Sequence, residues 1–224
     1  RANIIDAQKA RLDNINAIAS EIYYQNLYPN EYLGVTSEMF QEALAELTLS
    51  DLKQFHRQYY HATNAKIIIV GKISHENAAD LARTISLHLG RGEQAPPIEH
   101  QRPNYEAKRI EHPFDSPQSR IFMGHPSINF YDEDYFPLLL GNHILGGSGL
   151  TSELMIRLRE ELGLTYGIYS SFAPTLFYGP FTITFSTKNE QVDEAIAESL
   201  ALIERFIEEG PSDKALELAK NNLI

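Results

Sequence analysis

The stretch from Leu145 to Tyr166 reads Leu-Gly-Gly-Ser-Gly-Leu-Thr-Ser-Glu-Leu-Met-Ile-Arg-Leu-Arg-Glu-Glu-Leu-Gly-Leu-Thr-Tyr and carries the strongest signal in the chain. It predicts a glycine turn, an amphipathic helix over 151–162, a helix stop at Gly163 and then the start of a strand. Arg159 comes seven residues before Tyr166. This arrangement can direct a guanidinium and a phenol into one cleft beside the glycine loop.

The residues on either side of this stretch predict alternating groups of helices and strands. Phe181, Ile183 and Phe185 alternate with small hydroxyl residues, which predicts a strand with one buried face. The run of branched residues over 66–71 predicts a strand buried on both faces. Further helices are predicted at 2–25, 37–45, 50–60, 74–89, 132–145, 190–209 and after Ser212, and further strands at 108–111, 119–124, 166–172 and 180–187. Strands that follow one another, with helices grouped beside them, predict a two-layer α+β fold.

Residues 90–104 are rich in proline, glycine and charge, which predicts a linker. We therefore expect the C-terminal part of a first α+β repeat over 1–95, a linker over 96–104 and a second repeat over 105–224. The chain starts on Arg1 inside a predicted helix and stops at Ile224 inside another. The sequence is therefore expected to be part of a longer protein, with the first repeat incomplete and the second truncated at its end.

The composition excludes several classes of function. The net charge is −11, from 19 basic and 30 acidic residues, which argues against a nucleic-acid-binding protein. The chain has no cysteine, so disulfides, thiolate metal sites and cysteine nucleophiles are excluded. No apolar run approaches the roughly 20 residues that span a bilayer. The acidic balance mildly favours basic or neutral peptides as ligands.

Eight histidines raise the question of a metal site, but their spacing does not favour one. His56 and His61 are five residues apart and fall on different faces of a helix, whereas helical zinc pairs are three or four residues apart. His112, His125 and His143 have no spacing that requires them to converge. No His-x-x-Glu-His, nucleophile elbow, phosphate loop or dinucleotide fingerprint occurs. We therefore expect no metal ligand and no catalytic residue in this chain.

The candidate site residues also have structural explanations. Gly146, Gly147 and Gly149 precede a helix whose amides can bind an anion, but they follow a helix, so they also fit a helix-to-helix turn. Arg159 can be solvated among Glu153, Glu160 and Glu161. Tyr166 can belong to the core, because it has the strand parity of Ile168 and Phe172.

The pattern Leu-Gly-Gly-x-Gly, Ser-x-Leu, Arg-Leu-Arg-Glu-Glu, Gly-Leu-Thr-Tyr-Gly resembles the second repeat of the pitrilysin and mitochondrial processing peptidase family, the inverzincin zinc proteases. The segments Tyr28–Tyr32, Leu47–Leu52, Tyr59–Ala65 and Ile69–Gly71 resemble the end of a first repeat of this family, and Gly210–Ser212 resembles the tail of a second. The resemblance covers nearly the whole chain, and the Arg159–Tyr166 segment is its most specific part.

The resemblance implies paired α+β repeats, each an antiparallel sheet with helices on one side, that close into a chamber for extended peptides. It implies that Arg159 and Tyr166 hold the substrate backbone near the scissile bond, and that the loop with Gly146, Gly147 and Gly149 contacts substrate. The family's zinc is held by a His-x-x-Glu-His helix, which this sequence lacks. Catalytic members also carry glutamates along the first helix, where this chain has no glutamate before Glu21.

Three hypotheses follow. The first is a non-catalytic, substrate-binding subunit or domain of a zinc metalloendopeptidase, with the zinc in a partner subunit or in a missing N-terminal segment. The second is a scaffold or interaction protein that uses the same fold without proteolysis. The third is the C-terminal fragment of a single-chain catalytic peptidase. We expect a peptide ligand, a zinc-bearing family partner in a homodimer or heterodimer, and a periplasmic or otherwise exported location, with mitochondrial and cytoplasmic locations left open.

Overall fold

The computed structural model describes residues 2–11, 13–98 and 105–223. These residues form two compact units. One unit holds the described residues up to Met39 together with those from Tyr105 onward, and the other holds Phe40–Ile98. The first unit joins the start of the chain to the predicted second repeat through packing of a helix on a sheet. The repeat boundaries themselves stay a prediction.

An antiparallel sheet of three strands organises the first unit, in the order β1-β3-β2. The strands are β1 (Gln118–Pro126), β2 (Ile168–Phe172) and β3 (Pro180–Lys188). The α+β fold is therefore confirmed. The strand predicted over 166–172 begins only at Ile168, which leaves Tyr166 in the preceding loop. The strand predicted over 108–111 is wrong, because these residues form no ladder in the structure.

The hydrophobic core lies on one face of this sheet. Phe185 is fully buried on the central strand, with Ile121 opposite it on β1 and Ile168 opposite it on β2. Leu154 and Leu158 belong to the helical segments on this face and pack against the same three side chains. Burial of each such side chain contributes about 1.5–3 kcal/mol to the free energy of folding. The apolar residues that alternate along β3 therefore stabilise the packing of the helices on the sheet.

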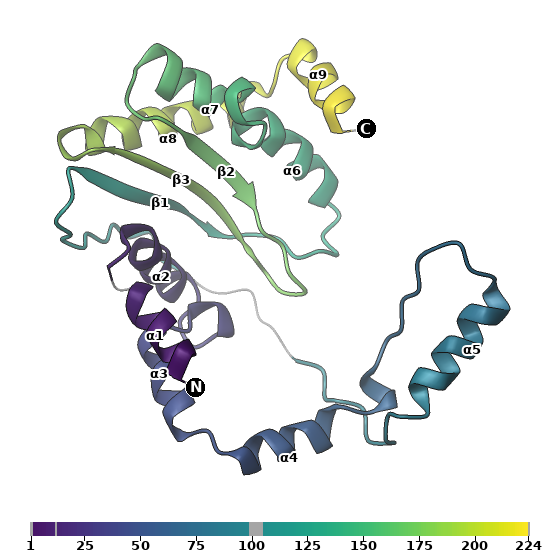
Figure 1. Cartoon of the computed structure of the whole chain (residues 1–224). Helices are drawn as coiled ribbons and strands as arrows, with labels where there is room; N and C mark the ends of the chain where they lie inside the picture. Colours follow the sequence, from purple (N-terminus) through teal and green to yellow (C-terminus); the bar gives the residue numbers. More distant parts are fainter. Residues whose placement is uncertain (1, 12, 99–104, 224) are drawn as a thin grey trace. The chain divides into compact units, whose positions relative to one another are not determined.

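A layer of helices covers the core face, drawn in green and yellow in Figure 1. The long α8 confirms the helix predicted over 190–209, and Gly210 ends it with a φ of 70°. The predicted helices over 132–145 and 151–162 are each interrupted by a wider π turn. In chain order the elements of the layer are α6 (Tyr135–Asn142), the π turn η3 (His143–Gly147), η4 (Gly149–Thr151), α7 (Glu153–Met155), the π turn η5 (Ile156–Glu161), η6 (Asn189–Gln191), α8 (Val192–Glu209) and α9 (Asp213–Leu223).

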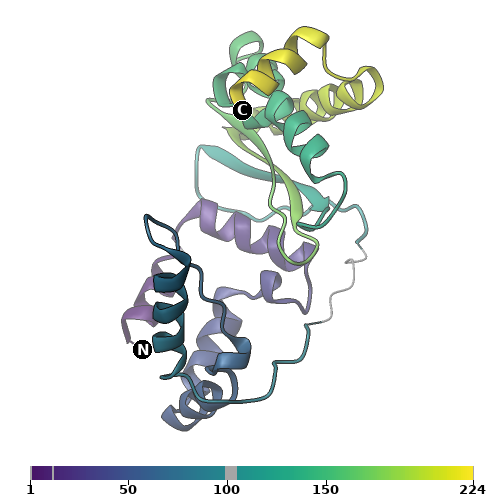
Figure 2. The ribbon, with the colours of Figure 1, turned by 90° about the vertical axis from the view of Figure 1, so that its right-hand side faces the viewer.

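A helix from the start of the chain packs on the opposite face of the sheet (Figures 1 and 2). The helix predicted over 2–25 is two helices, α1 (Ala2–Arg11) and α2 (Ile15–Leu27), because the Asn14 side chain caps a new helix at the amides of Asn16 and Ala17. The Tyr23 hydroxyl donates to the Phe181 carbonyl oxygen (3.1 Å) and thereby fastens α2 to β3. A short turn, η1 (Tyr32–Gly34), follows α2.

The second unit contains α4 (Leu49–Tyr59), η2 (Ala62–Asn64) and α5 (His75–Ser86), preceded by α3 (Ser37–Glu46), which begins in the first unit. The Thr48 side chain caps α4 and forms a capping box with Asp51, and the Ser74 side chain caps α5.

The strand predicted over 66–71 is wrong, since Ile68 and Val70 are 84% and 91% exposed. No described segment pairs with it, and an extended run cannot be buried on two faces without neighbouring strands. Residues 99–104 of the predicted linker lie outside the described residues.

Candidate functional site

Arg159 lies in the π turn η5 and keeps its guanidinium largely free. Its Nε atom lies 3.5 Å from the Glu160 carboxylate, and the two side chains are 39% and 57% exposed. A pair this long and this exposed contributes little energy. Glu161 instead pairs with Arg157 at 2.9 Å. The Arg159 guanidinium can therefore donate to another partner at small cost.

Tyr166 is 87% exposed, so the interpretation that places it in the core is wrong. The residues before it are anchored to the sheet. The Thr165 hydroxyl donates to the Ser186 carbonyl oxygen (2.7 Å), and the Thr187 hydroxyl donates to the Leu164 carbonyl oxygen (2.6 Å). These two bonds hold the loop against β3 while the Tyr166 ring points away from it. An exposed phenol on an anchored loop is available to a ligand.

Arg159 and Tyr166 lie at the two ends of one tight turn. Gly163, between them, has a φ of 65°, a conformation that favours glycine. The Leu164 amide donates to the Leu158 carbonyl oxygen (2.8 Å), which closes the turn. Within the described residues no hydrogen bond joins the two candidate side chains, and their joint action on a ligand stays a prediction.

Gly146 and Gly147 allow η3 to pack closely on β2. A Cβ atom on Gly146 would lie 2.3 Å from the Ser170 hydroxyl, and one on Gly147 would lie 2.8 Å from the Asn142 side-chain amide. Asn142 and Ser170 are joined by two hydrogen bonds, from Asn142 Nδ2 to the Ser170 carbonyl oxygen (3.1 Å) and from Ser170 Oγ to Asn142 Oδ1 (2.6 Å). Steric fit explains these two glycines without a ligand. Sequence reasoning missed Asn142 and Ser170, which carry no motif of their own.

Gly149 differs from the other two glycines. A Cβ atom there would meet no neighbour, but its φ of 69° favours glycine. Its carbonyl oxygen accepts from the Ser152 hydroxyl at 2.8 Å. Gly149 therefore shapes the turn that leads into α7.

The Asn142–Ser170 pair also limits access to the edge of the sheet at β2. The Ala173 amide donates to the Pro180 carbonyl oxygen of the neighbouring strand at 3.0 Å. Because bonding direction alternates along an antiparallel strand, the backbone groups of Ile168 and Ser170 point away from β3. The Asn142 side-chain amide donates a hydrogen bond to the Ser170 carbonyl oxygen, which points away from β3. Ile168, the residue of this edge nearest to Tyr166, is fully buried, so the edge is covered there as well.

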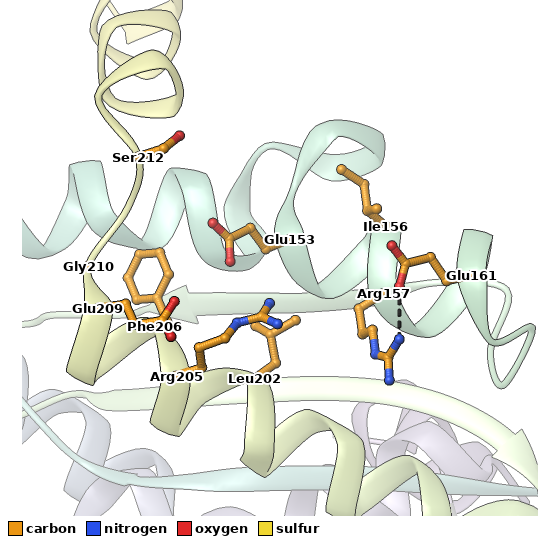
Figure 3. Close-up of a pocket in the computed structure, with 10 residues that line it drawn as sticks. All are labelled: Glu153, Ile156, Arg157, Glu161, Leu202, Arg205, Phe206, Glu209, Gly210 and Ser212. Atoms are coloured by element: carbon orange, nitrogen blue, oxygen red, sulfur yellow. Dashed lines mark hydrogen bonds and ion pairs between the residues drawn. The ribbon is translucent and has the colours of Figure 1, made fainter.

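A separate hollow of about 390 Å³ lies between η5, α8 and the start of α9 (Figure 3). Its lining includes Arg157, whose pKa is raised by hydrogen bonds to Glu161 and Glu198. Neither Arg159 nor Tyr166 lines it. The hollow is therefore distinct from the predicted site.

The described residues do not fit a zinc ion. They contain no group of three or more histidine, aspartate or glutamate side chains that could hold a metal. His61 is buried, with its Nε2 atom 2.9 Å from the Gln58 carbonyl oxygen. The first glutamate of the chain, Glu21, accepts from the Ser37 amide (2.9 Å) at the start of α3. None of the described helices is long and apolar enough to cross a membrane.

Comparison with known proteins places this geometry in a family. The family model described as the peptidase M16 inactive domain matches residues 46–223. The crystal structure of a peptidase M16 inactive domain from Pseudomonas fluorescens is similar over 99% of this chain and 54% of that one, with 31% identity and a TM-score of 0.90.

Two curated relatives differ in how their names describe activity. An uncharacterized zinc protease, YmxG, from Bacillus subtilis is 26% identical over 92% of this chain and 49% of that protein. A non-peptidase homolog, also YmxG, from Helicobacter pylori is 23% identical over 89% of this chain and 46% of that protein. The chain thus spans about half the length of these relatives. Since the family model matches most of its length, the chain belongs to the peptidase M16 inactive domain family.

Proposed function

We propose that this chain is the non-catalytic, substrate-binding part of a zinc metallopeptidase, and that it holds an extended peptide for a zinc centre supplied by other protein. The observation that carries the proposal is the exposure of Tyr166, which is 87% accessible on a loop anchored to the sheet. A tyrosine kept for packing would be buried.

In this proposal Arg159 and Tyr166 donate hydrogen bonds to the peptide backbone. The guanidinium can donate two bonds to a carbonyl oxygen or to the developing oxyanion, and the phenol adds one more. Strand pairing of the peptide with β2 is opposed, because Asn142 donates to the outward carbonyl oxygen of Ser170 and Ile168 is fully buried.

The test uses the chain assembled with its zinc-bearing partner and a fluorogenic peptide. Loss of one oxyanion donor typically costs about 2.7–4 kcal/mol, or 10²–10³ in kcat. Tyr166→Phe and Arg159→Ala are each expected to lower kcat/KM by this order. Tyr131→Phe and Arg83→Ala are matched controls, because Tyr131 is 80% exposed and Arg83 pairs with Asp80 on the surface. Normal cleavage by both site variants would refute the proposed roles.

A scaffold function without proteolysis is the second candidate, and the relative named a non-peptidase homolog favours it. A constitutive complex with subunits that are not proteases, recovered by affinity purification, would support the scaffold over the peptidase.

The relatives named zinc proteases are about twice as long as the aligned region, which favours a third candidate, the C-terminal part of one catalytic chain. Reading the gene upstream of Arg1 for a His-x-x-Glu-His helix decides between a separate subunit and a single chain. Cell fractionation tests the proposed exported location.

A further inference from the structure

The second unit, Phe40–Ile98, has almost no core of its own. Every residue of this range is described, and His61 is the one that is buried. Its helices α4 and α5 have 11 and 12 residues and contain no buried side chain. Helices of about this length are marginal in water by themselves, and their stability in proteins comes mainly from packing of an apolar side. The two helices therefore need a surface that this unit does not itself provide.

Both helices carry an apolar stripe that is exposed. On α4, Leu49, Leu52 and Phe55 follow one another every three residues and are 66%, 58% and 55% exposed. On α5, Leu81 and Ile85 are four residues apart and are also exposed. Residues at these spacings lie on one side of a helix, and in a folded domain that side packs on another element.

Residues 66–71, between the two helices, form no strand here but have the properties of a strand that lacks its partners. No described residue forms a hydrogen bond with the backbone groups of residues 66–70. Ile67 and Ile69 are half-buried, whereas Ile68 and Val70 between and after them are exposed. Alternation of this kind is typical of a strand with one covered and one uncovered face.

A β-sheet fits both the backbone and the side chains of this unit. An unpaired strand is completed by another strand, which supplies hydrogen bonds along its edge and can come from a second polypeptide. Helices next to a strand in sequence usually pack on the sheet to which that strand belongs, as the stripes of α4 and α5 would. A lone helix would instead leave the backbone of residues 66–70 without partners.

The similar protein from Pseudomonas fluorescens indicates where such a sheet comes from. Its structure matches 99% of this chain with a TM-score of 0.90, but the match covers only 54% of that protein. The curated relative from Bacillus subtilis is likewise covered over 49% of its length. In these relatives the same fold is accompanied by nearly as much sequence again, which is enough to supply a sheet.

We propose that residues 66–71 and the stripes of α4 and α5 together form a docking face for a β-sheet, and that an edge strand of this sheet pairs with residues 66–71. The sheet is supplied by the part of the family's length that this chain does not span. Neither Arg159 nor Tyr166 belongs to the docking face, so the proposal does not depend on the peptide-binding function.

The experiment mixes the 224-residue chain with the polypeptide of the same organism that matches the other half of the Pseudomonas fluorescens protein. Hydrogen–deuterium exchange with mass spectrometry follows the backbone amides of residues 66–71. In the chain alone these amides are expected to exchange freely. Paired amides exchange only when the pair opens, so the added polypeptide is expected to slow their exchange by at least about tenfold.

Two substitutions test the apolar part of the docking face. Ile68→Asp and Phe55→Asp are each expected to weaken the complex at least about tenfold, because each places an unpaired charge in the contact. Ile207→Asp on α8 is the matched control, since Ile207 is 75% exposed and lies outside the docking face, and it is expected to leave the affinity unchanged. All three side chains are exposed, so the thermal midpoint of the chain alone should not fall.

Several results would overturn the proposal. Slow exchange of residues 66–71 in the monomeric chain alone would mean that the chain covers this face itself. Slow exchange only in a concentration-dependent dimer, measured by analytical ultracentrifugation, would identify a second copy as the occupant. Failure of the two polypeptides to associate, a complex in which these amides still exchange freely, or a complex that Ile68→Asp does not weaken would each exclude the docking of a sheet here.

Discussion

The Tyr23 hydroxyl provides a direct test of whether α2 folds as part of the same unit as the sheet. It donates to the Phe181 carbonyl oxygen at 3.1 Å and lies 3.0 Å from the Thr182 hydroxyl. A hydrogen bond of this kind contributes about 0.5–1.5 kcal/mol net, and a buried group left without a partner costs about 1–3 kcal/mol. Since Thr182 is only 7% exposed, we expect Tyr23→Phe to lower the free energy of unfolding by about 1–3 kcal/mol.

Urea unfolding at neutral pH measures this loss. The midpoint is expected to fall with no change in slope, because the Tyr23 ring keeps its contact with Phe122 at 5.5 Å between centroids. Tyr131→Phe is the matched control, as Tyr131 is 80% exposed, and it is expected to change nothing. A loss below about 0.5 kcal/mol, the ordinary range of surface substitutions, would refute the role of this hydroxyl.

The same side chain predicts how stability depends on pH. Burial raises the pKa of Tyr23 and of Tyr28 above the ordinary phenol value of 10.0. The unfolded chain therefore releases these protons at lower pH than the folded chain does. The stabilisation is complete below about pH 10 and is lost as pH rises from there toward the raised folded-state pKa. In Tyr23→Phe the free energy of unfolding should fall less steeply with pH above about pH 10 than in wild type. Urea unfolding at several pH values measures this slope, and equal slopes in the two proteins would contradict a buried, neutral Tyr23.

Two further substitutions test the packing around the candidate site. Gly146→Ala should destabilise the fold by about 1–3 kcal/mol through overpacking against Ser170, whereas Gly149→Ala should cost about 1–2 kcal/mol through its left-handed backbone alone. Thermal unfolding measures both, and an unchanged midpoint for Gly146→Ala would exclude the close packing of η3 on β2. Arg157→Met should lower the free energy of unfolding only slightly, because its ion pairs are partly exposed. That cost should shrink in high salt, and a double-mutant cycle with Glu198→Gln that is insensitive to salt would contradict an electrostatic origin.

Helix boundaries in this chain were largely predictable, because capping is a local interaction. Thr48, Ser74 and Gly210 act at the helix ends that their residue types indicate. The alternation of Phe181, Ile183 and Phe185 likewise predicts which face of β3 is buried. Both signals involve residues within a few positions of each other, so they are visible before any tertiary contact forms.

The failed strand predictions have a different cause. Residues 66–71 and 108–111 have the composition of strands, but a strand exists only when another segment supplies its hydrogen bonds. The π turns η3 and η5 were not predicted either, because a helical residue pattern does not distinguish the wider hydrogen bonding of a π turn from that of an α-helix.

The sequence by itself determined the α+β class, the family and the candidate pair of Arg159 and Tyr166, because these rest on residue types and short spacings. Only the tertiary structure decided that Tyr166 is exposed, although its parity matches the core. It also revealed the hydrogen bond from Asn142 to Ser170 on the edge of β2. These features depend on contacts between residues far apart in the chain, and no local pattern specifies where such residues meet.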